Sequence, residues 1–104
     1  MTQNVHHEVT LEWQNGTVTP TPQPVRADAG DTISFVLWNQ PDGQLKVRFD
    51  EPNLFSAPEF NHGDPPVQIV KLERETTYAC AMNIGGKKFE VAGPQGGSIK
   101  PPRG

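Results

Sequence analysis

The sequence predicts an all-β domain, and three observations support this prediction. Apolar and polar residues alternate over short stretches, first between Val5 and Gln14, and a period of two is typical of a half-buried strand. The 10 glycines and 11 prolines are spread between such stretches, where they indicate turns between many short strands. A chain of 104 residues provides one modest core. We therefore expect a single domain over residues 1–92.

Eight stretches have the pattern expected of strands: 5–14, 17–21, 24–29, 32–39, 45–49, 67–72, 76–83 and 87–92. Asn15-Gly16 has the composition of a tight hairpin turn. Pro20, Pro22 and Pro24 lack an N–H donor, so the second stretch is predicted to form an edge strand or a loop. Residues 51–66 show no strand period and are expected to cross between sheets, with one helical turn near 53–57. Residues 93–104 are rich in Gly and Pro, and we expect a flexible C-terminal tail.

Charge and composition exclude several classes of partner. The formal net charge is −3, and basic and acidic residues are interleaved, so the chain lacks the concentrated positive face that nucleic acid requires. No apolar run approaches the length of a membrane span, and the start of the chain lacks the pattern of a signal peptide. A single cysteine excludes an intramolecular disulfide. We expect a soluble monomer.

Two motifs resemble a known family. The segment Tyr78-Ala79-Cys80 places an aromatic residue two positions before the only cysteine, and Gly30-Asp31-Thr32-Ile33-Ser34-Phe35 has the form Gly-Asp-x-Ile-x-Phe. Both resemble segments of cupredoxin domains of the plastocyanin and azurin type. The resemblance covers residues 25–92 in pattern, and it implies a Greek-key β-sandwich of seven to eight strands. It also implies a periplasmic or secreted location.

The copper ligands implied by this resemblance are mostly missing. A type 1 copper site combines a thiolate and two imidazoles with a weak axial thioether. Cys80 matches the thiolate, but Leu45 stands where the first histidine would be, and no histidine follows Cys80. Met82 lies only two residues after the cysteine, too close for the usual axial ligand. The resemblance therefore supports the fold, with the copper site lost.

The sequence leaves two interpretations of the remaining candidate residues open. Cys80 is either a small buried apolar group or a metal ligand. Met82 lies two positions further on the same face of the strand, and its simplest interpretation is a core residue. His62 is the only histidine on a loop that could approach the cysteine. An altered copper site would thus use Cys80, Met82 and His62. His6 and His7 point to opposite faces of a strand, so they cannot bind one ion together.

We expect no enzymatic activity, because none of the common catalytic motifs occurs. The leading hypothesis is a binding or accessory module, without a cofactor, that acts on a protein partner and not on nucleic acid or membrane. The alternative is a copper-binding or electron-transfer protein. Trp13 and Trp38 are interpreted as core anchors, or as part of a surface patch for a partner. The expected shared core consists of Val9, Leu11, Ile33, Phe35, Val47, Phe49, Tyr78, Cys80, Phe89 and Val91.

Overall fold

The computed structural model describes residues 4–14, 17–22, 24–38, 43–91 and 97–101, without the side chains of Thr17 and Val91. In this part of the chain the only helical segment is one short 3-10 turn, and no helix is long and apolar enough to cross a membrane. The elements are β1 (His6–Gln14), β2 (Thr17–Thr21), β3 (Val25–Arg26), β4 (Thr32–Leu37), β5 (Gln44–Phe49), η1 (Pro52–Leu54), β6 (Glu59–Asn61), β7 (Val67–Gln68), β8 (Thr76–Ile84), β9 (Lys87–Val91) and β10 (Ser98–Lys100).

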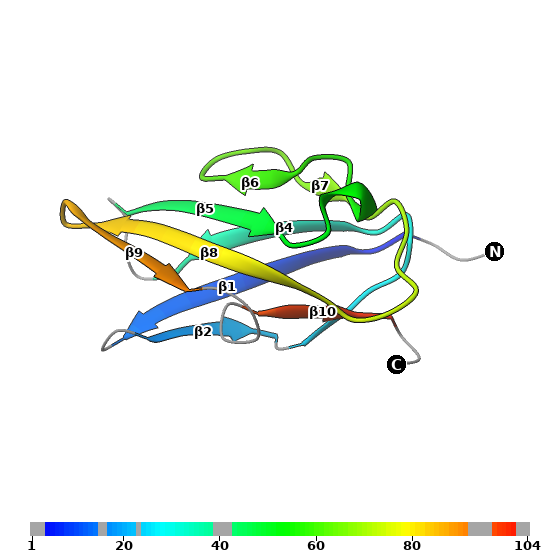
Figure 1. The fold of residues 1–104 in the computed structure, drawn as a ribbon, viewed down its shortest axis with the longest axis horizontal. Coiled ribbons are helices and arrows are strands. Elements are labelled where there is room, and N and C mark those ends of the chain that lie inside the picture. The colour runs from blue at the N-terminus through cyan, green and yellow to red at the C-terminus, as the bar shows by residue number, and fades with distance from the viewer. Residues whose placement is uncertain (1–3, 15–16, 23, 39–42, 92–96, 102–104) are drawn as a thin grey trace.

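The strands form two mixed sheets, which confirms the all-β prediction and a sandwich-like arrangement (Figure 1). The first sheet has the order β2-β1-β4-β7, with β1 and β4 parallel and the other pairs antiparallel. The second has the order β3-β10-β8-β5-β6, with β9 also paired to β8. One edge of β8 pairs with β5, and its other edge pairs first with β10 and then with β9. The cysteine strand is therefore central.

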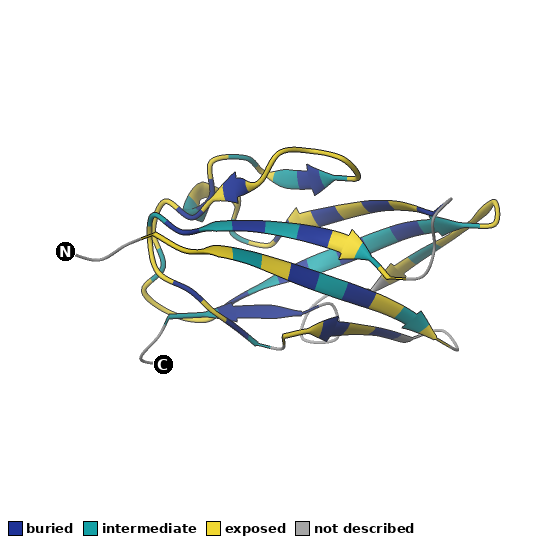
Figure 2. Ribbon diagram, turned by 180° about the vertical axis from the view of Figure 1, so that it is seen from behind, coloured by how far each residue is buried: buried dark blue, intermediate teal, exposed yellow. Residues whose placement is uncertain are grey.

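Side chains from both sheets form one hydrophobic core. Burial alternates along the strands because successive side chains point to opposite faces (Figure 2). In β8 the residues at even positions, Thr76 to Met82, are buried, and those between them are half-buried. Of the expected core residues, Val9, Leu11, Ile33, Phe35, Val47, Phe49, Tyr78 and Cys80 are buried, Phe89 is half-buried against the core, and the side chain of Val91 is outside the described part.

The Gly-Asp motif forms a buried polar junction between β1 and β4. Gly30 has a φ of +96°, a backbone conformation that glycine adopts without steric cost. The Asp31 carboxylate accepts hydrogen bonds from the backbone N–H groups of Val5 and Asp28, at 2.9 and 3.0 Å. It also lies 2.8 Å from Nε2 of His7. The motif therefore has a structural role.

The C-terminal segment differs from the expected flexible tail. Ser98–Lys100 form β10, which pairs with β8 and β3, and Ile99 is fully buried. Burial of one isoleucine in the core gives this short strand an anchor that its composition does not reveal. The expected tail is thus wrong for residues 98–100, while 93–96 and 102–104 lie outside the described residues.

Other differences concern short strands and one tryptophan. Residues 51–66 contain the expected helical turn as η1 but also the strand β6, and the strand expected over 67–72 shortens to β7. Trp38 is 54% exposed and Val36 is 40% exposed, so Trp38 is not a core anchor. Both side chains point to the outer face of the first sheet. No other layer of the described structure covers that face. The turn expected at 15–16 lies outside the described part of the chain.

Candidate functional site

The two sulfur-containing candidates lie on the core face of β8. Cys80 is fully buried, Met82 is 3% exposed, and both belong to the hydrophobic core. Burial raises the pKa of the Cys80 thiol to about 12, because a thiolate loses its hydration in an apolar environment. A thiol with this pKa is protonated at neutral pH. Cys80 therefore fits the role of a packed core residue.

Leu45 lies opposite Met82 in the register of β5 and β8. It is buried and occupies the position that the cupredoxin resemblance assigns to the first histidine. An aliphatic side chain there provides packing surface and no donor atom for a metal. This end of the core is therefore apolar where a type 1 site requires an imidazole.

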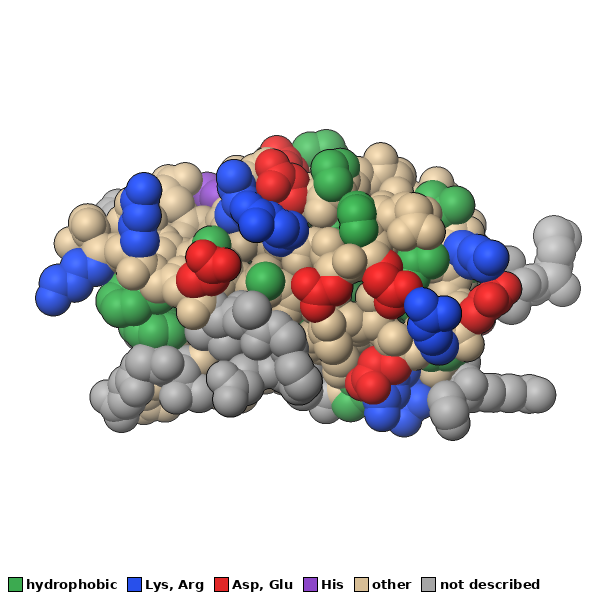
Figure 3. All heavy atoms as spheres, viewed as in Figure 1, with side chains coloured by type: hydrophobic (Ala, Val, Ile, Leu, Met, Phe, Trp, Pro, Cys, Tyr) green, Lys and Arg blue, Asp and Glu red, His purple; other side chains and the backbone are tan. Residues whose placement is uncertain are grey.

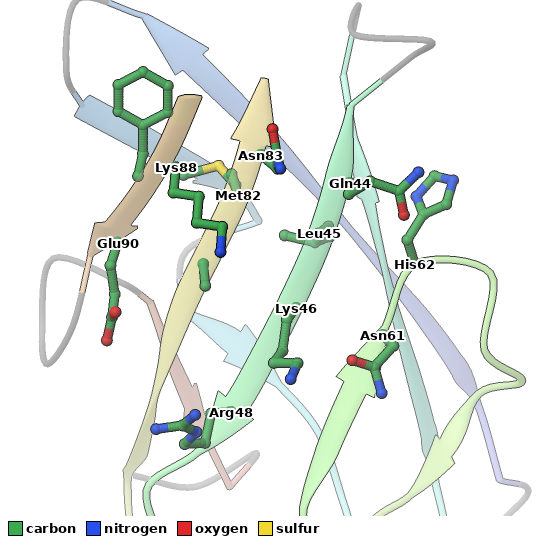
Figure 4. Close-up of a pocket in the computed structure, with 12 residues that line it drawn as sticks. Gln44, Leu45, Lys46, Arg48, Asn61, His62, Met82, Asn83, Lys88 and Glu90 are labelled. Carbon is green, nitrogen blue, oxygen red and sulfur yellow. The ribbon is translucent and has the colours of Figure 1, made fainter. Parts of the chain in front are cut away.

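His62 lies away from the two sulfur atoms. It follows β6 in a turn where Asp64 accepts a hydrogen bond from the Asn61 N–H at 2.7 Å, and its side chain is exposed. Because β5 separates β6 from β8, two strand spacings of about 4.8 Å each lie between His62 and the cysteine strand. Figure 4 shows His62 beside Gln44, across β5 from Met82. The structure does not bring His62 together with Cys80 and Met82.

These residues do not fit a type 1 copper site. The thiol is protonated and enclosed, Leu45 replaces one imidazole, and His62 stands outside the core. In the described part of the chain, no three His, Cys, Asp or Glu side chains are grouped closely enough to hold a metal ion. Any altered site with Cys80, Met82 and His62 would require a rearrangement of β5 and β8.

The other two histidines have structural partners. His6 lies at the exposed end of β1, with Nδ1 2.8 Å from the Thr32 hydroxyl and Nε2 3.1 Å from the Ser34 hydroxyl. His7 is half-buried and contacts Asp31. The two rings therefore point to opposite sides of the strand, as the sequence predicts.

A groove of about 590 Å³ lies on the outer face of the second sheet. Its floor is β8, where Ala81 and Asn83 alternate with the inward-facing core residues. β9 bounds it on one side, and β5 with the end of β6 bounds it on the other. The residues that line it are Gln44, Leu45, Lys46, Arg48, Asn61, His62, Ala81, Met82, Asn83, Lys88, Phe89 and Glu90 (Figure 4). Small side chains in the centre and long ones on both sides make the face concave.

Three cationic side chains surround this groove. Lys46 and Arg48 belong to β5 and Lys88 to β9, and Arg48 and Lys88 both extend toward β8 in Figure 4. Lys46 has an acidic neighbour, Glu59, at 3.9 Å. Arg48 and Lys88 make no ion pair or side-chain hydrogen bond with any residue that the structure describes. Figure 3 shows Lys and Arg side chains gathered where β5, β8 and β9 lie.

Sequence reasoning did not identify this groove, although part of its signal was present. Lys46 and Arg48 alternate with buried Leu45 and Val47, which indicated a charged outer face for this strand. The alanines of β8 and the distant Lys88 join that face only through strand register. Register depends on contacts between segments far apart in the chain.

Comparison with protein-family models, with curated proteins and with solved structures found no match to this chain.

Proposed function

We propose that the protein is a cupredoxin-like binding or accessory module without a type 1 copper site, and that it binds an anionic ligand in the outer groove of β5, β8 and β9. One observation carries this proposal. Arg48 and Lys88 extend over a floor of small side chains, and neither has an acidic partner among the described residues.

The positions of the two motif strands support the cupredoxin-like part of the proposal, to which the Greek-key connection belongs as a further expectation. The Gly-Asp strand β4 and the Tyr-x-Cys strand β8 are interior strands of the two sheets. Both contribute aromatic side chains to the same core, where the rings of Phe35 and Tyr78 lie 5.0 Å apart. The two motifs that resemble the family thus contact each other across one core.

Electrostatics favour an anion in this groove. The protein has a net charge of −3. Around the groove, by contrast, the three cations outnumber the two described carboxylates beside them, Glu90 on β9 and Glu59 on β6. A cation in a concave site with low-dielectric walls attracts an anion more strongly than one on a convex surface. Arginine also offers paired N–H donors that match a carboxylate, sulfate or phosphate.

An NMR titration with a small dianion tests the binding site. With malonate as the probe at low ionic strength, we expect saturable shifts of backbone amides in 44–48, 79–83 and 88–90. The charge-removing variants Arg48→Gln and Lys88→Gln should each weaken malonate binding several-fold, and together about tenfold, because each removes a cation and lowers the positive potential of the groove.

Lys87→Gln is the matched control. Lys87 is exposed, has the same charge and precedes Lys88 in β9, but strand alternation directs it to the other face, and it does not line the groove. We expect less than a twofold change. Shifts confined to other surfaces, or equal losses in all three variants, would show that the groove is not the binding site.

The absence of a type 1 copper site has its own test. Strong sulfur-to-copper charge transfer requires a thiolate and imidazoles in one plane. The wild-type protein should stay colourless when cupric ion is added. An intense visible band that disappears in Cys80→Ser would overturn this part of the proposal and favour the copper-binding alternative.

A further inference from the structure

We propose that the ligand of the outer groove is an extended segment of a partner protein with acidic side chains at alternate positions. This inference rests on the proposed anion-binding function of the groove and names its ligand class. It follows from the spacing of the three cations, which the strand register fixes.

The register arranges the outer face of the sheet in rows across the strands. Arg48 is opposite Ala79, Lys46 is opposite Ala81, and Asn83 lies between Gln44 and Lys88. Opposite residues in antiparallel strands point to the same face. The rows at positions 79, 81 and 83 of β8 therefore carry one cation each: Arg48, Lys46 and Lys88. The first two rows also end in a carboxylate, Glu59 on β6 and Glu90 on β9.

Successive rows are two residues apart along β8. A strand rises by about 3.4 Å per residue, so the three cations repeat at about 7 Å along the groove. Alternate side chains of an extended peptide repeat at the same distance, because the peptide has the same rise. A peptide aligned with β8 could thus place carboxylates at positions i, i+2 and i+4 beside the three cations in turn.

The dimensions of the groove suit a single extended chain. The walls on β5 and β9 are two strand spacings apart, about 10 Å between backbones. Ala79 lines a small hollow that adjoins the groove and shares Lys46, Arg48, Ala81 and Glu90 with it. With this hollow the floor runs from Ala79 to Asn83, four residue steps or about 14 Å. Ala79 and Ala81 project only one methyl group each, so a backbone could approach the sheet closely. The length corresponds to four or five extended residues.

The polar residues of the groove suit a peptide backbone. The side-chain amides of Gln44, Asn61 and Asn83 line the groove and can each donate and accept hydrogen bonds. Glu90 lies across Ala81 from Lys46 and repels a carboxylate from the β9 side of this row. The central acidic side chain should therefore turn toward β5.

An acidic oligosaccharide is the competing ligand. Among the described residues, Phe89 is the only Phe, Tyr or Trp that lines the groove, and His62 lies at its β6 edge. Its ring packs against Trp13, with 4.3 Å between ring centroids, so it faces the interior side of β9. The described groove therefore offers no Phe, Tyr or Trp ring on which a sugar could stack, whereas it offers the charge spacing of an extended peptide.

Fluorescence anisotropy with labelled peptides tests the inference. The first peptide is Ser-Glu-Thr-Glu-Thr-Glu-Ser, and the second is Ser-Thr-Glu-Glu-Glu-Thr-Ser, with equal composition and charge but consecutive acidic residues. We expect the alternating peptide to bind about tenfold more tightly at low salt. Oligogalacturonate serves as the acidic oligosaccharide probe and should compete weakly. Equal affinity for both peptides, or stronger competition by oligogalacturonate, would overturn the inference.

Two variants and one control distinguish a failure of the peptide proposal from a failure of the proposed anion site. Ala81→Leu fills the floor of the groove and keeps all three cations. It should weaken the alternating peptide about tenfold and malonate by a much smaller factor, because the small dianion needs less of the floor than an extended backbone does. Arg48→Gln should weaken both ligands, and Lys87→Gln neither. If malonate binds in the groove but Ala81→Leu leaves peptide affinity unaltered, the peptide proposal fails and the anion site stands. If malonate does not bind there, both fail.

Discussion

Asp31 and His7 join the beginnings of two parallel strands through a contact of 2.8 Å between a carboxylate oxygen and an imidazole nitrogen. The same carboxylate accepts backbone hydrogen bonds from Val5 and Asp28. Asp31 is only 5% exposed, and a buried carboxylate is tolerated when hydrogen bonds satisfy it. One acidic residue thus holds the start of β1, the Asp28 turn and β4 together.

Replacing Asp31 with asparagine should destabilise the protein by about 2 kcal/mol, because an amide cannot accept the same set of bonds and would leave buried donors unsatisfied. Urea unfolding measures this difference. Asp28→Asn is the matched control, since it makes the same chemical change on an exposed side chain of the same turn. We expect that variant to lie within about 0.5 kcal/mol of the wild type. Equal losses in the two variants would contradict the assigned role of Asp31.

The stability should also depend on pH through Asp31. Burial alone would raise its pKa, but hydrogen bonds from His7, Asp28 and Val5 outweigh burial and hold the pKa below the ordinary value of 3.8. A carboxyl with a lowered folded-state pKa stabilises the fold above its unfolded pKa and loses this contribution as the pH falls through the folded value. The stability gap between wild type and Asp31→Asn should therefore narrow below pH 3.8. Urea midpoints in acidic buffers measure the gap, and a constant gap would refute the mechanism.

The sequence predicted the strands in which apolar and polar residues alternate over many positions. In β1, β4, β5 and β8, apolar residues recur over six to nine residues, enough to identify both the strand and its buried face. β6 and β10 have three residues each, too few to show a period. Their pairing depends on partners elsewhere in the chain, such as β8 for β10.

For the candidate sites, too, the sequence predicted what depends on one strand and not what depends on pairing between strands. The core position of Cys80 and Met82 could be predicted because parity on one strand sets it. The groove could not, because Lys46 and Lys88 meet at one surface only after β5, β8 and β9 are paired in register. Trp38 was predicted to be a core anchor or part of a surface patch. Its exposure rules out the core anchor, and the sequence could not decide because the outcome depends on which face of β4 the second sheet covers.

Gly97 should be the glycine least tolerant of substitution among those described. Its φ is +137°, and a Cβ built there would overlap the Tyr78 ring and hydroxyl group. Gly97→Ala should cost about 3 kcal/mol, from backbone strain and overpacking together. Gly63→Ala is the control, since Gly63 also has a positive φ of +84° but open space around its Cβ position, and about 1 kcal/mol is expected there. Urea unfolding of both variants measures the difference, and similar losses would argue against the Tyr78 contact.

Tyr78→Phe should leave stability unchanged or raise it by up to about 1 kcal/mol. The Tyr78 hydroxyl is buried and has no hydrogen-bond partner among the described residues, so its removal relieves a desolvation cost without breaking a bond. The phenyl ring keeps its contact with Phe35. Thermal and urea unfolding measure the change. A loss above about 1 kcal/mol would mean that the hydroxyl makes a stabilising bond.

The Cys80 thiol should react slowly in the folded protein. The thiolate is the reactive form, and the pKa of about 12 leaves only about one thiol in 10⁵ ionised at neutral pH. The side chain is also fully buried, so a reagent must wait for an opening of the core. We expect labelling of the native protein by a thiol reagent to be at least about a hundredfold slower than labelling of the urea-unfolded chain.

Two further measurements separate the core role of Cys80 from a metal-ligand role. Cys80→Ala removes one buried sulfur atom, so we expect a loss of about 1 kcal/mol in unfolding free energy and no change in malonate binding at the groove. Cuprous ion should leave the labelling rate of the native protein unaltered, because Met82 shares the enclosed core face and His62 lies two strands away. Fast native labelling that cuprous ion suppresses would instead require Cys80 to reach a metal from the solvent, and it would overturn the core assignment.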